Sequence, residues 1–136
     1  MIGAYYFITS LMLIYNTVRD LKTQEIDERF NYLALGATLM LIPILKPSWL
    51  LLLVLIFLSI LSSIFFKKAM ASGDLQALNW IYLGLGIIDY TKVIKFLISL
   101  TGLFTLSFAI TKLLKANKLA PGYPLILGSY IIAIFW

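Results

Sequence analysis

Residues 47–66 read PSWLLLLVLIFLSILSSIFF and carry no charged side chain over 20 positions. A helix rises about 1.5 Å per residue, so this stretch is long enough to cross a hydrocarbon core of about 30 Å. Apolar and polar residues do not alternate along it, as they would in a transmembrane strand. The segment therefore predicts a membrane-spanning α-helix.

The same pattern recurs along the chain, because its eleven basic and six acidic residues are clustered rather than spread among the 136 positions. Five more charge-free windows follow, at 1–18, 30–45, 75–88, 96–111 and 119–136. With 62% hydrophobic and 12% charged residues, the composition excludes a soluble globular domain and a disordered chain. We expect an all-α integral membrane protein with one domain, 1–136, and about six transmembrane helices. Five spans with a re-entrant segment at 75–88 are the alternative.

Lysine and arginine are distributed unevenly among the predicted loops. The first, third and fifth loops carry eight of them, and the second and fourth carry three. The positive-inside rule places the odd-numbered loops in the cytoplasm and both termini outside. This asymmetry accounts for the net charge of +5 without a nucleic-acid partner.

The chain has no cysteine and no histidine. A thiol nucleophile, a Ser-His-Asp triad and nearly every zinc or haem site are thereby excluded. The spacing of the six acids fits no EF-hand loop. We expect neither a cofactor nor a metal, and any chemistry must come from carboxylates, lysine, tyrosine, serine or threonine.

Two aspartates, Asp20 and Asp74, are expected at the cytoplasmic edge of the membrane, directly after the first span and directly before the fourth. Ionisable groups at that depth are costly and are functional candidates. Each also has a purely structural interpretation. The carboxylate of Asp74 can stabilise the positive end of a helix dipole, and Asp20 can be an interfacial anchor that pairs with Arg19 or Lys22. A close pair of carboxyls, by contrast, shares a proton. The ionised one activates water for attack on a peptide carbonyl; the protonated one polarises that carbonyl and later donates to the leaving amine.

The helix dipole predicts how the two carboxyls divide these roles. Asp74 is expected near the N-terminus of its helix, where the dipole favours the anion, and Asp20 near the C-terminus of another. We therefore expect Asp74 to be the ionised partner and Asp20 to hold the proton.

Three stretches resemble a known family. Residues 20–26, DLKTQEI, resemble the first aspartate motif, D-x-K-T-x-x-I, of type IV prepilin peptidases. Residues 71–78, ASGDLQAL, resemble their GxGD motif, and 121–125, PGYPL, are similar to the segment that opens their last span. The order of the motifs, their depth and the six-helix layout agree, so the resemblance covers nearly the whole chain.

The resemblance implies a GxGD aspartyl protease of a prokaryotic cell membrane, bacterial or archaeal, with its active site facing the cytoplasm. Asp20 and Asp74 would be catalytic, and Lys22 and Gly73 would support the motifs. The partners would be the lipid bilayer and precursors of pilins, pseudopilins or archaeal flagellins, which carry a basic leader and an apolar helix. Larger members have a cysteine-containing insert and methylate the new N-terminus; this chain lacks both insert and cysteine, which implies a peptidase-only form.

Three positions depart from the family pattern. Ala71 replaces the first glycine of GxGD, Gln76 stands where a basic residue is common, and Asp27 stands where proline is common. These departures bear on substrate choice and, to a lesser degree, on activity.

The acids Glu25, Asp27 and Glu28 follow Asp20 in the first cytoplasmic loop. Because the substrates of the family are basic before the cleavage point, we expect this cluster to bind the leader. A solvated loop, with its acids balanced by neighbouring basic side chains, is the alternative.

Two other functions remain open. An inactive relative could act as an assembly partner in a pilus or secretion complex, as the altered motif residues suggest. A small transporter could use the aspartates for protons or a cation, but such sites usually lie near the bilayer midplane.

Overall fold

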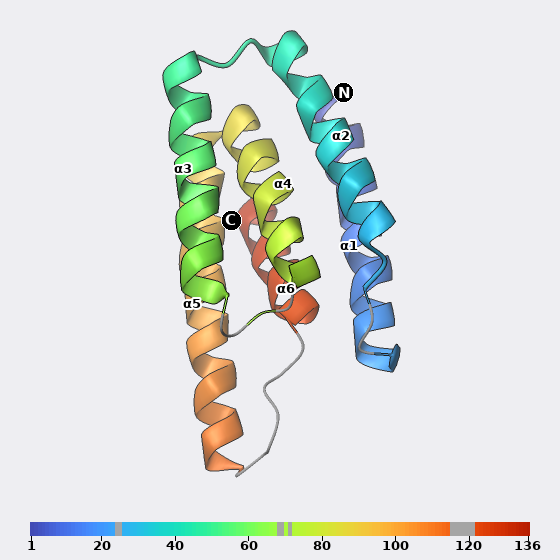
Figure 1. Cartoon of the computed structure of the whole chain (residues 1–136), viewed down its shortest axis with the longest axis vertical. Coiled ribbons are helices and arrows are strands. Elements are labelled where there is room, and N and C mark those ends of the chain that lie inside the picture. The colour runs from blue at the N-terminus through green and yellow to red at the C-terminus, as the bar shows by residue number, and fades with distance from the viewer. Residues whose placement is uncertain (24–25, 68–69, 71, 115–121) are drawn as a thin grey trace.

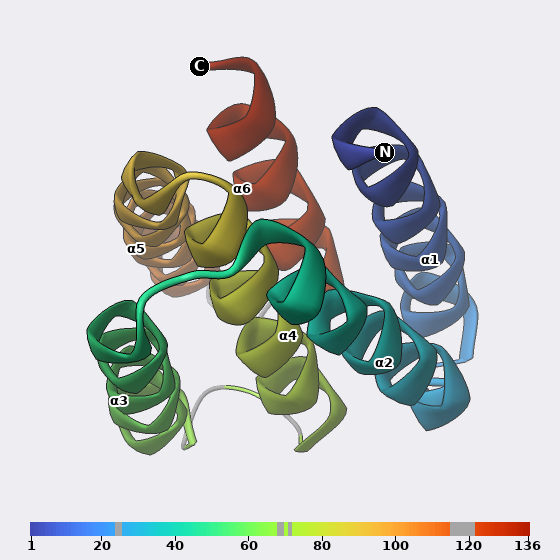
Figure 2. The ribbon, with the colours of Figure 1, turned by 90° about the horizontal axis from the view of Figure 1, so that it is seen from above.

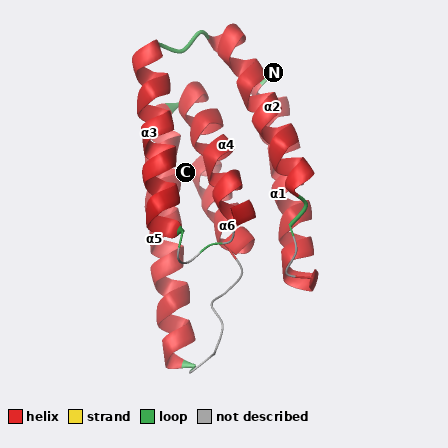
Figure 3. Cartoon of the chain, in the orientation of Figure 1, coloured by secondary structure: helices red, strands yellow, loops and turns green. Residues whose placement is uncertain are grey.

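The computed structural model describes residues 1–23, 26–67, 70, 72–114 and 122–136. In these ranges the chain forms helices and no strand (Figure 3). The helices are α1 (Ile2–Thr23), α2 (Glu28–Leu45), α3 (Trp49–Phe66), α4 (Ser72–Ile88), α5 (Tyr90–Leu113) and α6 (Gly122–Phe135). Each of the six helices contains most of one charge-free window, so the predicted all-helical class is confirmed for the described residues.

Side-chain caps explain where several helices begin. Asp27, Ser48 and Asp89 lie in extended conformation just before α2, α3 and α5, and each accepts a hydrogen bond from a backbone N–H of the first turn. Such caps satisfy N–H groups that have no partner within the helix. At the other end of α2, Lys46 adopts a left-handed conformation with φ of 46° and closes the helix through its N–H to Ile42 O.

Helix α4 lies in the middle of the bundle, with α2, α3, α5 and α6 around it, while α1 packs against α2 and α6 (Figure 2). Two glycines of α4 allow this close packing. A Cβ on Gly84 would overlap the Tyr5 hydroxyl, and one on Gly86 would overlap Leu55. Small residues let membrane helices approach closely in this way.

The outer surface of the bundle is strongly apolar. Large apolar side chains of α3 are among the most exposed: Trp49, Leu50, Leu53, Phe57 and Phe65. Monomeric soluble proteins rarely expose large contiguous apolar patches. By length and composition, α3 and α5 could each cross a membrane, and α6 is a shorter apolar helix. The structure is that of a helical protein suited to membrane association.

The helices run alternately up and down, so the end of α1 and the starts of α4 and α6 lie at the same end of the bundle (Figure 1). The α2–α3 and α4–α5 turns lie at the opposite end. Asp20 and Asp74, which are 54 positions apart in the sequence, therefore belong to the same end, as predicted.

Candidate active site

Asp20 and Asp74 are both buried, although each stands at a helix end. Asp20 lies in the last turn of α1 and is 7% exposed; Asp74 lies in the first turn of α4 and is 4% exposed. A carboxylate that only anchors a helix at an interface would keep its oxygens in water. Both aspartates are buried because the start of α6 covers them, as the next contacts show.

The first residues of α6 contact both carboxyls. A Cβ on Gly122 would overlap the Asp74 carboxyl, and the backbone N–H of Tyr123 is directed at the Asp20 carboxyl. Because Gly122 and Tyr123 are adjacent, bond lengths and a hydrogen-bond length place the two carboxyls within about 10 Å of one another. Both are also close enough to interact electrostatically with the phenol of Tyr123. Three helices thus bring the pair together.

The surroundings of Asp20 favour its protonated form. Asp20 lies beyond the charge-free window 1–18, and burial raises its pKa above the ordinary value, while the N–H of Tyr123 opposes the shift. Its Oδ2 atom is buried and makes no hydrogen bond with the described residues. Asp74 instead stands in the first turn of α4, where the helix dipole favours an anion. The direction at Asp20 is the one that the predicted division of roles requires; the ionised state of Asp74 stays a prediction.

The two aspartate motifs touch one another. A Cβ on Gly73 would lie 3.1 Å from Ile26 Cδ1, so this motif glycine packs tightly against the isoleucine of the first motif. The Gly73 carbonyl accepts a hydrogen bond of 3.0 Å from Asn31 Nδ2. The residue before Asp74 is therefore held by the segment that follows Asp20 and by α2. Ala71 lies outside the described residues.

A buried polar network supports this arrangement. The Tyr123 hydroxyl donates to Asn31 Oδ1 at 2.5 Å and accepts from Asn16 Nδ2 at 3.3 Å. Trp80 Nε1 also donates to Asn31 Oδ1, at 3.3 Å. Sequence reasoning missed these four residues. The signal was an amide side chain within each of the first two apolar windows, where a polar group must find a partner.

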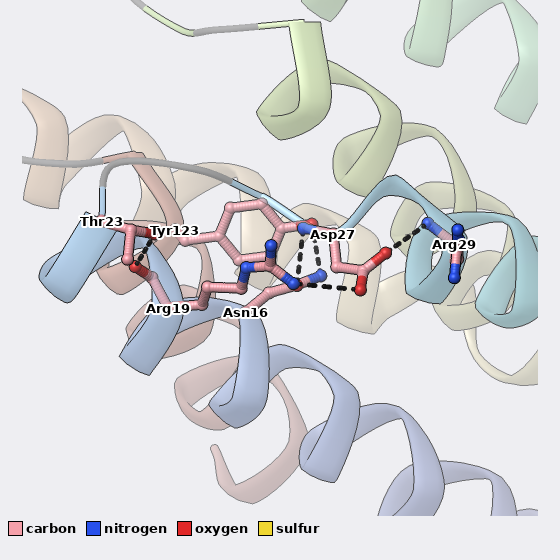
Figure 4. A network of polar contacts seen from close by, with 6 residues as sticks. All are labelled: Asn16, Arg19, Thr23, Asp27, Arg29 and Tyr123. Carbon is pink, nitrogen blue, oxygen red and sulfur yellow. Dashed lines mark hydrogen bonds and ion pairs between the residues drawn. The ribbon is translucent and has the colours of Figure 1, made fainter.

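The network continues into the first loop, where Asp27 is a helix cap (Figure 4). The backbone N–H of Asp27 donates to Asn16 Oδ1 at 3.3 Å. Its carboxylate pairs with Arg19 Nη1 at 3.1 Å and accepts from the Arg29 N–H. Asp27 thus has structural partners on both sides, which compete with the expected binding of a leader.

The other predicted residues lie around this centre. Lys22 and Glu28 are exposed, and Glu28 stands in the first turn of α2. Glu25 lies outside the described residues. Gln76 is half-buried. The structure thus brings together Asp20, Asp74 and Gly73 and leaves Lys22 and Glu28 on the surface.

Within the described ranges, no three acidic side chains gather where they could hold a metal ion. Comparison of the chain with protein-family models, curated proteins and solved structures found no match. The function is therefore inferred from the motifs and from the geometry of this site.

Proposed function

We propose that the protein is a membrane aspartyl endopeptidase of the type IV prepilin peptidase kind. It spans a prokaryotic cell membrane six times and removes the basic leader of prepilin-like precursors at the cytoplasmic face. The observation that carries this proposal is the convergence of the buried Asp20 and Asp74 on the adjacent residues Gly122 and Tyr123. The matching motifs and the contact between Gly73 and Ile26 support it.

In this mechanism the two carboxyls act as one acid–base pair. The ionised Asp74 takes a proton from water as the water oxygen attacks the scissile carbonyl carbon, and the protonated Asp20 donates a hydrogen bond to the carbonyl oxygen. The pair, which has gained the proton of the water, then protonates the leaving nitrogen. The C–N bond breaks, and the pair returns to one proton.

The aspartates are covered in the resting protein. Because Gly122 and Tyr123 lie against the carboxyls, a peptide can reach them only when the first turn of α6 moves away. Such an opening step is common in enzymes whose active sites exclude water. Glu28, exposed at the start of α2, is available to attract a basic leader.

The test is cleavage of a prepilin-like precursor in membranes by the unaltered protein and by Asp20→Asn and Asp74→Asn. Asparagine keeps the shape but cannot ionise, so each variant should lose activity on the order of 10³-fold at normal membrane levels. Asp89→Asn, at the opposite end of the bundle, is the matched control and should stay within about twofold, because surface changes are mild.

Cleavage that survives in either active-site variant would eliminate the two-aspartate mechanism. If the unaltered protein cleaves none of a panel of precursors, the inactive assembly partner becomes the better reading. Proton or cation flux into liposomes that depends on Asp20 or Asp74 would favour the transporter.

A further inference from the structure

Thr17 lies one turn before Asp20 on the buried face of α1. Thr17 is 8% exposed and Asp20 is 7% exposed. Residues three apart are neighbours on a helix, with about 5–6 Å between their Cβ atoms. The threonine hydroxyl and the carboxyl are therefore enclosed beside one another.

The hydroxyl of Thr17 differs from those of the other threonines within the described helices. A helical threonine can donate a hydrogen bond back to the carbonyl of the preceding turn. Six of them do so: Thr9, Thr23, Thr38, Thr101, Thr105 and Thr111. The Oγ1 atom of Thr17 is buried and makes no hydrogen bond with the described residues. Its own helix therefore does not use this hydroxyl.

A second buried oxygen next to it is in the same condition. Asp20 Oδ2 also makes no hydrogen bond with the described residues. A buried polar group without a partner costs free energy, and most such groups in folded proteins are paired with protein atoms or with ordered water. Two unpaired oxygens one turn apart therefore indicate a ligand that they share.

Water has the size and the chemistry of such a ligand. Two hydrogen bonds of about 2.8 Å span about 5.6 Å, which matches the spacing of side chains three residues apart. Buried waters typically bond to polar groups that have no other partner. Because water both donates and accepts, it suits the Asp20 carboxyl with or without its proton.

We propose that Thr17 Oγ1 and Asp20 Oδ2 hold one water molecule between them, and that Thr17 positions the Asp20 carboxyl through this water. The N–H of Tyr123 holds the carboxyl from α6, and the water holds it from α1. A group that must meet a scissile carbonyl needs such a fixed orientation. The water site rests on the contacts of α1, whereas its part in cleavage rests on the proposed function.

The first experiment detects the water without using cleavage. Infrared difference spectra at acidic pH compare the unaltered protein in liposomes with Thr17→Val and Thr17→Ser, and the C=O band of protonated Asp20 is assigned by its loss in Asp20→Asn. Valine keeps the shape of threonine but has no hydroxyl. We expect Thr17→Val to move the C=O band to higher frequency and to abolish an O–H band that shifts in water labelled with a heavy oxygen isotope. Serine should preserve both bands.

Thr9→Val is the matched control for the loss of a hydroxyl. Thr9 lies on the same buried face of α1, but its hydroxyl already bonds to the Tyr5 carbonyl and the Tyr130 hydroxyl. This variant should leave both bands in place. An Asp20 band that is unchanged in Thr17→Val, or that moves without any isotope-sensitive water band in the unaltered protein, would overturn the water site.

The second experiment measures cleavage kinetics at equal membrane levels. Thr17→Val should lower kcat about tenfold with KM unchanged, because it loosens a group that acts in the reaction and not in substrate binding. Thr17→Ser keeps the hydroxyl and should stay within about threefold of the unaltered protein. Thr9→Val should leave both constants unchanged. A normal kcat for Thr17→Val would contradict the positioning role.

The two experiments separate this inference from the proposed function. A water band that depends on Thr17, with no cleavage by the unaltered protein, would support the water site and reject the peptidase. Cleavage that depends on both aspartates, with identical infrared bands in Thr17→Val, would do the opposite.

Discussion

Asp20 and Asp89 lie at opposite ends of the bundle, and their surroundings shift their pKa values in opposite directions. Yet each follows a charge-free apolar window in the sequence, Asp89 directly and Asp20 after one residue. Asp89 caps α5, and its Oδ1 atom accepts from the Thr91 N–H at 3.0 Å and the Thr91 hydroxyl at 2.7 Å. Those hydrogen bonds, with help from Lys92 and Lys95, lower its pKa. Asp20 is covered by another helix, and burial raises its pKa. Position beside an apolar window therefore does not decide the role of an aspartate; the fold around it does.

The largest effect should come from filling the space beside the pair. Gly122→Val places a branched side chain where the Asp74 carboxyl lies, and displacing a catalytic group by about 1 Å can cost on the order of 100-fold in rate. We expect cleavage to fall by at least about that factor. Gly102→Val is the matched control, because nothing lies within 4 Å of a Cβ added there.

Precursor cleavage at equal membrane levels measures this difference. Normal cleavage by Gly122→Val would mean that the start of α6 does not set the geometry of the pair. The difference between the covered aspartates at one end and the capping Asp89 at the other would then not explain their roles.

A smaller effect, on stability, should come from the network at the aspartate end. Asn31→Leu leaves the Gly73 carbonyl, Trp80 Nε1 and the Tyr123 hydroxyl short of a partner. We expect the free energy of unfolding to fall by about 2 kcal/mol. Unfolding in mixed micelles measures it. Tyr32→Leu, an exposed change on the same helix, should stay within about 0.5 kcal/mol; equal losses would show that the network adds nothing.

The pH dependence of stability should have opposite signs for the two aspartates. Because the folded protein raises the pKa of Asp20 above 3.8, it binds that proton more tightly than the unfolded chain does, and stability falls as pH rises through this range. Asp20→Asn should therefore raise Tm at pH 7, with the gain shrinking toward pH 4. The pKa of Asp89 is lowered, so Asp89→Asn should lower Tm slightly at pH 7, with the loss shrinking as pH falls. Thermal unfolding in detergent over this range measures both; shifts of the same sign would refute the contrast.

The smallest effect concerns the lysines beside Asp89. Lys92 Nζ donates to the Ile134 carbonyl at 3.0 Å, and Lys95 Nζ to the Trp136 carbonyl at 3.0 Å, so both cap the C-terminus of α6. Lys95→Gln should lower the unfolding free energy by about 0.5 kcal/mol and leave cleavage unchanged. Lys112→Gln, at the far end of α5, is the control. A cleavage defect in Lys95→Gln alone would show that the two ends are coupled.

The sequence was enough to predict the helices and the common end of the two aspartates. Charge-free windows mark the helices because a charge inside an apolar bundle is costly, and the alternation of direction along the chain then puts Asp20 and Asp74 at one end. Asp27 also carried a local signal, since an aspartate just before an apolar helix is a common cap. The basic leader expected of the substrates favours a second role for Asp27, leader binding, which its capping contacts leave untested.

The neighbours of the aspartates could not be predicted in the same way. Hydrophobic patterning tells which residues avoid water, but not which helix packs against which. That Gly122 lies against Asp74, and that Tyr123 meets Asn16 and Asn31, depends on the packing of the last helix against the first two. Only the three-dimensional arrangement reveals those pairs.

The position of these hydrogen bonds also bears on how the protein is made. Thr9 and Asn16 on α1 and Asn31 on α2 are bonded to tyrosines of α6, namely Tyr130 and Tyr123. Synthesis proceeds from the N-terminus, so in the proposed six-span arrangement the first two helices enter the bilayer long before these partners exist. Until the last helix inserts, the side chains of Thr9, Asn16 and Asn31 lack these tyrosine partners and face lipid or one another. A chain stopped before α6 is therefore expected to be a target for membrane quality control rather than a smaller version of the protein.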